Sequence, residues 1–171
     1  MDCWCCGCSS HRFGYQKMIT ADAFWMGRKD KYVDELSVMV QRNAAETLGK
    51  VNTLLSFAEM DGIYCNECSS GWRPSAVNDA TANAAKNSKH KTGQAVDVTD
   101  PDRRLAQWCI MNLGRLDRLG LWMEDPRWTP TWVHFQTVPP SSGRRVFIPS
   151  TKPPLAPALV GQASVPAFIK V

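Results

Sequence analysis

Apolar residues recur at helical spacing along one long segment of the chain, residues 31–58. Residues three, four and seven positions apart share one face of a helix, so this stripe predicts an amphipathic helix that packs on the core. Asp61 and Gly62 follow the segment and predict its end. The stripe consists of Val33, Leu36, Met39, Val40, Ala44, Leu48, Val51, Leu54, Leu55 and Ala58.

The rest of the pattern combines short strands with a second helix. Asp100 and Pro101 are typical of a helix start, and we expect that helix to run to about Leu119 and to end at Gly120. Small polar residues over 75–89 predict a surface loop. These elements indicate an α+β domain with helices packed on one antiparallel sheet. Strands are expected at residues 63–65, 95–98, 121–123 and 132–137.

Both ends of the chain depart from this pattern. Residues 1–17 are rich in cysteine and carry no periodic apolar face, so we interpret them as a mobile extension. Residues 149–171 are rich in proline and predict an extended tail. The sequence therefore predicts one domain over residues 18–148. Thiols in the first segment could bind zinc or copper, but their crowding does not define a ligand geometry: Cys3, Cys5, Cys6 and Cys8.

Composition and charge exclude some partners. The chain has 44% apolar and 21% charged residues, as ordinary folded domains do. Its formal net charge of +4 is mild and no dense stripe of Lys and Arg is present, so we expect no nucleic-acid partner. No apolar run approaches the roughly 20 residues of a membrane span, and no secretory signal is recognisable. We expect a monomer without membrane insertion.

The seven cysteines do not indicate a disulfide framework, because their number is odd and no secretion signal accompanies them. Cys65 and Cys68 form a C-x-x-C, a spacing found in redox motifs and in half of a zinc site. Gly71 and Pro74 follow where a redox motif needs a helix, and no second C-x-x-C is present. Two reduced, partly buried thiols are therefore expected.

Two of the three histidines lie in segments that suit metal binding. His90 is followed seven residues later by Asp97, and His134 lies in a predicted strand. A catalytic zinc site uses three protein ligands and keeps a fourth position for water, whose pKa the residual charge lowers toward about 7. His90 and Asp97 can share one ion if the chain turns back at Gly93. Spacing alone leaves a polar loop histidine as the alternative.

The pattern S-x-H-x-x-G-x-A-x-D followed by W-x-H resembles the zinc D-alanyl-D-alanine carboxypeptidase family, which shares its fold with the Hedgehog signalling domain. The resemblance covers roughly residues 20–148 and implies a Hedgehog/DD-peptidase-like fold. It also implies one zinc ion held by His90, Asp97 and His134 on the open face of the sheet. The residues that carry the resemblance are Ser88, His90, Gly93, Ala95, Asp97, Trp132 and His134, with Ser70, Gly71, Trp72 and Arg73 matching an upstream S-G-[YW]-R element.

The resemblance further implies roles for residues around the zinc. Arg73 would approach the substrate carbonyl or the oxyanion, with a surface ion pair as the alternative. Gln94 would contact the substrate, and Ser88 would hydrogen-bond the substrate or a metal ligand, although Ser88 could equally cap its loop. Three aromatic residues could line a groove or pack in the core: Trp72, Trp128 and Trp132.

The general base is the position at which this chain departs from the family. Several members carry a Glu three residues before the last histidine, where this chain has Thr131, which cannot accept a proton. Glu124 is the preferred base, because residues 121–124 and 132–137 could be adjacent strands. Asp125 is the second candidate, and a solvated turn position for Glu124 is the alternative.

These inferences predict a zinc metallopeptidase that hydrolyses a peptide bond in the stem peptides or cross-links of bacterial peptidoglycan, with D,D- or L,D-type specificity. Family members include bacterial D,D-peptidases, vancomycin-resistance dipeptidases and phage endolysins. The size and the missing signal favour a phage or prophage lysis enzyme that accumulates in the host cytoplasm. The alternatives are a virion-associated peptidase and an inactive, zinc-stabilised module that binds the cell wall.

Overall fold

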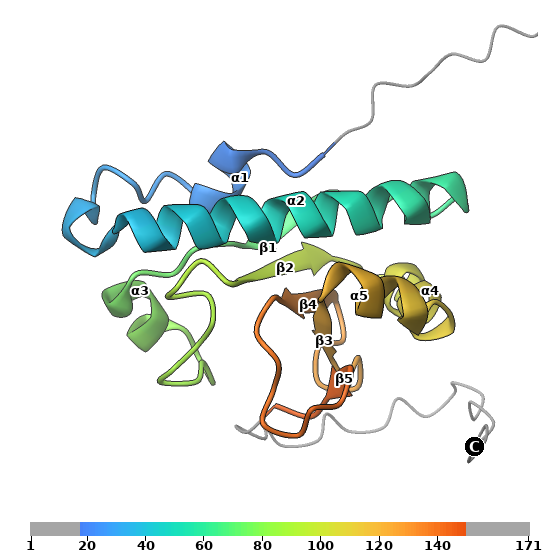
Figure 1. Cartoon of the computed structure of the whole chain (residues 1–171). Coiled ribbons are helices and arrows are strands. Elements are labelled where there is room, and N and C mark those ends of the chain that lie inside the picture. The colour runs from blue at the N-terminus through green and yellow to red at the C-terminus, as the bar shows by residue number, and fades with distance from the viewer. Residues whose placement is uncertain (1–17, 150–171) are drawn as a thin grey trace, which may run out of the picture.

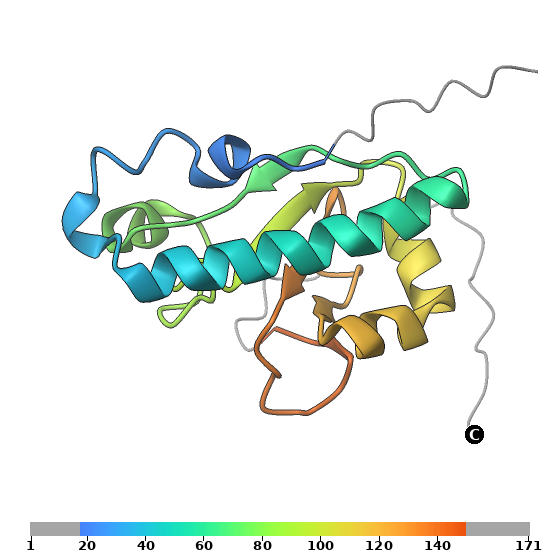
Figure 2. The same cartoon turned by 45° about the horizontal axis from the view of Figure 1, so that its top comes forward.

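A long helix lies across one face of a five-stranded sheet in the computed structural model of the chain, which describes residues 18–149 (Figure 1). Turning the view shows α2 in front of the sheet, with α4 and α5 beside one end of it (Figure 2). The predicted α+β class is confirmed. The elements are α1 (Ala21–Trp25), the 3-10 helix η1 (Val33–Glu35), α2 (Val38–Met60), β1 (Cys68–Ser70), α3 (Ser75–Ala80), β2 (Ala95–Thr99), α4 (Arg104–Met111), α5 (Leu113–Leu119), β3 (Trp122–Glu124), β4 (Trp132–Gln136) and β5 (Val146–Phe147).

The sheet is mixed, so the expectation of a wholly antiparallel sheet is wrong. Its strand order is β1-β2-β4-β3-β5, and only the β3–β5 pair is parallel. Both edges of β4 are already occupied by β2 and β3, so the chain that returns after β4 pairs with the free edge of β3. Since β3 and β5 both run opposite to β4, they run parallel to each other.

The two faces of the sheet have opposite chemical character. In the β2–β4 register Val96 pairs with Phe135, and Asp97 pairs with His134. Side chains alternate between faces, so the two apolar residues project from one face and the two polar ones from the other. The apolar face contributes to the buried core together with one side of α2. This helix therefore covers one face, and the polar groups gather on the other.

The helix α2 begins at Val38, seven residues after the start of the predicted segment at residue 31. The Ser37 hydroxyl accepts a hydrogen bond from the Val40 N–H and caps the helix at Ser37. The preceding residues form η1, and both Val33 and Met39 are exposed. The predicted end of the helix is confirmed, since Asp61 forms the C-cap.

The second predicted helix is two helices. The predicted start at Asp100 and Pro101 is wrong, because α4 begins at Arg104 with Arg103 as its N-cap residue. The Asp100 carboxylate nevertheless accepts hydrogen bonds from the backbone N–H groups of Leu105 and Ala106 in the first turn. The helix is interrupted at Asn112, and α5 then continues to Leu119. Gly120 ends α5 in the left-handed conformation, with φ of 62°, as predicted.

Two further predictions differ from the structure. The expected strand at residues 63–65 is absent, and the edge strand β1 begins at Cys68 instead. The expected loop over residues 75–89 contains α3, which begins directly after Pro74. The strands expected at 95–98, 121–123 and 132–137 correspond to β2, β3 and β4.

The thiols within residues 18–149 are free, as expected for Cys65 and Cys68, which are half-buried. Burial raises the pKa of Cys65 to about 11 and that of Cys68 to about 12. In the same part of the chain no helix has both the length and the apolar character needed to cross a bilayer. The cysteine-rich residues 1–17 and most of the proline-rich tail lie outside the described residues.

Candidate metal centre

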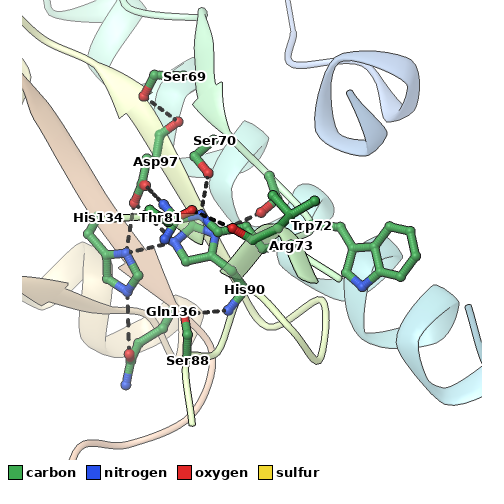
Figure 3. Close-up of polar contacts among 12 residues, drawn as sticks. Ser69, Ser70, Trp72, Arg73, Thr81, Ser88, His90, Asp97, His134 and Gln136 are labelled. Carbon is green, nitrogen blue, oxygen red and sulfur yellow. Dashed lines mark hydrogen bonds and ion pairs between the residues drawn. The ribbon is translucent and has the colours of Figure 1, made fainter. Parts of the chain in front are cut away.

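Three potential ligand atoms converge on the polar face of the sheet (Figure 3). The Nε2 atom of His90 lies 3.3 Å from Asp97 Oδ1 and 3.3 Å from His134 Nδ1. Asp97 Oδ1 lies 2.7 Å from His134 Nδ1. Ligands about 2.0–2.1 Å from a tetrahedral zinc ion lie about 3.3 Å apart, so two of the three separations already suit zinc. The residues His90, Asp97 and His134 are only 2%, 5% and 7% exposed, respectively.

Strand register and one tight turn bring the three residues together. The antiparallel pairing of β2 and β4 places Asp97 directly opposite His134. His90 arrives from the preceding loop, which turns back at Gly93 with φ of +72°. A Cβ at Gly93 would lie 2.6 Å from the Val40 carbonyl oxygen, so only glycine fits there. The predicted turn at Gly93 is confirmed.

A backbone carbonyl orients the ring of His90. Its Nδ1 lies 2.7 Å from the Gly71 carbonyl oxygen. A carbonyl can only accept, so Nδ1 carries the hydrogen and Nε2 presents its lone pair to the other two ligands. The Gly71 backbone packs so closely on Phe24 that a Cβ at Gly71 would lie 2.0 Å from the Phe24 carbonyl oxygen. The glycine in the S-G-W-R element thus allows the carbonyl to reach His90.

The outer atoms of the other two ligands also have partners. Arg73 Nη2 donates to Asp97 Oδ2 at 2.7 Å, and Arg73 Nε donates to Ser70 Oγ at 2.7 Å. His134 Nε2 lies 3.4 Å from Gln136 Oε1. Every ligand is therefore oriented by a second contact, as in protein metal sites generally. The donor set and its supporting contacts fit a bound divalent ion.

The electrostatics of the group suit metal binding. Burial opposes ionisation of Asp97, but the two imidazoles hold its pKa below the ordinary value, so it is a carboxylate. Burial lowers the pKa of His90, which keeps this imidazole neutral. Burial also disfavours charge on His134, but Glu124 and Asp97 outweigh it and raise the pKa of His134. A metal ion bound here would place positive charge between the two carboxylates, which the raised pKa of His134 shows to be favoured at this position.

Glu124 lies beside the group, on the neighbouring strand. Trp122 pairs with Gln136, and Met123 pairs with Phe135, so continuing this register places Glu124 opposite His134 and on the same face. Glu124 is a half-buried strand residue, so the alternative of a solvated turn is wrong. Burial raises the pKa of its carboxyl group. One row of the polar face thus crosses all five strands: Ser70, Asp97, His134, Glu124 and Phe147.

Phe147 closes one side of this row. Its ring packs edge-on against the His134 ring, with the ring centres 6.4 Å apart. Phe147 is 7% exposed and pairs with Glu124 in the β3–β5 register. The parallel strand that sequence analysis did not predict therefore supplies the apolar neighbour of both side chains.

The remaining predicted site residues all form contacts with other groups of the protein. Arg73 forms an ion pair with Asp97, and its predicted contact with the substrate stays a prediction. Ser88 Oγ accepts from the His90 N–H at 3.4 Å, as the loop-cap alternative requires. Gln94 Oε1 accepts from Thr92 Oγ1 within its own loop. Asp125 is bound by Arg127, with a shortest separation of 2.6 Å.

The tryptophans near the motif differ in how deeply they are buried. Trp72 is fully buried, packs edge-on against Trp25 and points away from the three ligands, so it belongs to the core (Figure 3). Trp128 and Trp132 are half-buried. Thr131 is exposed and precedes β4, and its carbonyl oxygen accepts from the Asp100 N–H.

The contact between Gln136 and His134 is one that the sequence did not predict. The available signal was position alone, because Gln136 follows His134 by two residues in a predicted strand and therefore shares its face. Period-two spacing shows which residues share a face but not which ones touch.

Comparisons of this chain with family models, with curated proteins and with solved structures give no match. The resemblance to zinc D-alanyl-D-alanine carboxypeptidases therefore stays a prediction that rests on the motif residues. The structure adds that those residues meet: a buried group of His90, Asp97 and His134 could hold a metal ion.

Proposed function

We propose that this protein is a zinc-dependent peptidase with a Hedgehog/DD-peptidase-like fold. One observation carries the proposal: three buried potential ligands converge on the polar face of the sheet, and a carboxyl group with a raised pKa lies on the same face. Two imidazoles and one carboxylate would hold the ion and leave a position for water. Bound there, zinc supplies Lewis-acid polarisation and a more acidic water.

Glu124 is the general base of the proposed reaction. It shares the polar face with His134 and is held in a half-buried strand rather than in solvent. A raised pKa brings a carboxyl group closer to neutral pH, where it can both take a proton from water and return it to the leaving amine. Asp125 is the weaker candidate, because Arg127 engages both of its oxygens.

Arg73 provides the permanent positive charge of the site. It is mostly buried and lies within hydrogen-bond distance of Asp97, so its guanidinium group is fixed close to the reacting centre. A fixed cation in a site that excludes water stabilises negative charge as it develops on a carbonyl oxygen. We therefore retain Arg73 as the group that favours the oxyanion.

Peptidoglycan stem peptides are the proposed substrate, because the sequence motifs resemble those of wall peptidases. A phage or prophage lysis enzyme that acts from the host cytoplasm is the proposed context. A virion-associated peptidase would use the same site. An inactive wall-binding module is disfavoured by Glu124, because its carboxyl group shares the face of His134 and could act as the base.

Mass spectrometry of purified peptidoglycan tests this proposal. We expect the full-length protein, with zinc verified by elemental analysis, to release new amino and carboxyl termini, and a chelator to abolish the release. The masses of the products identify the bond that is cut. An intact digest from the zinc-loaded protein would contradict the proposal.

The Glu124→Gln variant tests the base, and Asp125→Asn is its matched control. We expect Glu124→Gln to retain zinc and to lose about 100-fold or more in rate, the usual contribution of a positioned base. Asp125→Asn should stay within about threefold of the parent, since its carboxylate is bound to Arg127. The opposite ranking would assign the base to Asp125.

A further inference from the structure

Gln136 is buried beside one of the three ligands, and neither its place in a motif nor the resemblance assigns it a role. It is 6% exposed and lies two residues after His134 on β4, so both side chains occupy the same face. Its amide contacts two groups, the His134 ring and the Val138 carbonyl. A buried amide with both ends engaged has a defined orientation.

The contact with Val138 decides which end of the amide faces the histidine. The Val138 carbonyl oxygen can only accept, so the Gln136 NH₂ group must point toward it. The amide oxygen Oε1 therefore faces His134 Nε2, at 3.4 Å. An amide oxygen is also only an acceptor, so it favours the imidazole form in which Nε2 carries the hydrogen.

In that form a metal ion can take the place of the hydrogen that Nδ1 of His134 shares with Asp97 Oδ1 in the metal-free protein. Nδ1 is the ring atom that faces the other two ligands, 2.7 Å from Asp97 Oδ1 and 3.3 Å from His90 Nε2. We propose that Gln136 is a positioning residue that holds His134 in the orientation and tautomer needed to bind zinc through Nδ1. The proposal rests on the metal site proposed above but not on peptidase activity.

The two histidines are supported in complementary ways. His90 donates from Nδ1 to a backbone carbonyl and presents Nε2, whereas His134 faces Gln136 with Nε2 and presents Nδ1. Of these two outer acceptors, only the one on His134 belongs to a side chain. Its contribution can therefore be removed by a single substitution without changing a ligand.

Two substitutions at Gln136 separate this role from a general packing role. Gln136→Met removes the acceptor at similar size, and we expect the affinity for zinc to fall about tenfold or more. Gln136→Glu keeps an oxygen acceptor, and we expect it to bind zinc within about threefold of the parent. Asn52→Leu is the matched control, because it removes an amide that bonds the Ile19 backbone from α2 and should leave zinc affinity unchanged.

Competition between the full-length protein and a chelating dye for zinc alone measures these affinities. Nitrogen-15 spectra of the zinc-loaded parent should show His134 bonded to zinc through Nδ1 and protonated at Nε2. Equal affinity of the parent and Gln136→Met, or equal loss in both Gln136 variants, would overturn the role of Gln136 and leave the proposed function standing. A parent that binds no zinc would overturn both.

Discussion

The carboxyl group of Glu124 links the chemistry of the site to stability. Burial raises its pKa above the ordinary value of 4.5, so the fold disfavours its ionised form. Below that value Glu124 is protonated in both the folded and the unfolded chain. As the pH rises, the unfolded chain loses this proton first, so the stability that protonated Glu124 contributes is lost as the pH passes its folded-state pKa.

Replacing Glu124 with Gln should therefore stabilise the metal-free protein at neutral pH. We expect Glu124→Gln to melt a few degrees above the parent at pH 7, and the difference to disappear near about pH 4. Thermal unfolding in the presence of a chelator, followed by circular dichroism across this range, measures the effect. A variant that is less stable than the parent at pH 7 would show that ionised Glu124 is favoured by its surroundings.

The Glu124 carboxyl group also shows how much of the site can be predicted from residue types alone. Glu124 was predicted to be the base on the expectation that residues 121–124 and 132–137 form adjacent strands. The pairing of β3 with β4 confirms that these strands are adjacent. The three potential ligands were easier to predict, because their motif resembles that of a zinc peptidase family and their side chains are donors that zinc prefers. Gln136 contacts His134 through its side-chain amide, and Gly71 contacts His90 through its backbone carbonyl. Residue type does not specify which partner such a group contacts.

The approach of β1 to α1 controls the ligand His90 from a distance. Gly71 follows β1 and packs against the Phe24 backbone at the end of α1, with its carbonyl oxygen on His90 Nδ1. Any side chain at Gly71 would push the two segments apart. The geometry of the site thus depends on how closely these two elements pack.

We expect Gly71→Ala to lower the free energy of unfolding by about 3 kcal/mol, because an added methyl group would overlap backbone atoms that cannot move independently. The zinc affinity of the folded variant should also fall, since the carbonyl that orients His90 is displaced. Denaturant unfolding and zinc competition measure the two effects. Gly49→Ala is the control, because a Cβ at Gly49 meets nothing within 4 Å.

The errors in the predicted elements have local and non-local causes. The helix α2 begins later than predicted because Ser37 caps it. The apolar spacing continues before Ser37, so the prediction placed the start too early. The break at Asn112 lies within an apolar run that gives no sign of an interruption, and α3 lies in a segment of mostly small polar residues. The parallel strand β5 has a non-local cause, because its partner is set by which strand edge remains free.

Zinc should stabilise the molecule as a unit, because its ligands come from two strands and a loop that meet only in the fold. Zinc at 100 times its dissociation constant adds about 2.7 kcal/mol, which should raise the melting temperature by several degrees. Thermal unfolding with zinc and with chelator measures this shift. Asp97→Asn should abolish it, and an equal shift in that variant would place the zinc elsewhere.

The sequence by itself determined the long helix, the strands that carry Asp97 and His134, and the turn at Gly93. These features depend on the spacing and chemistry of near neighbours, which the chain displays directly. The three converging residues were predicted from the resemblance of their motif to that of a zinc peptidase family, because spacing alone left a polar loop histidine as the alternative. Only the tertiary structure decided that Glu124 lies beside His134, that β5 closes the row with Phe147, and that Gly71, Arg73 and Gln136 orient the ligands. The physical reason is that strand register and close backbone contact join residues far apart in the chain, and packing of the whole core selects them.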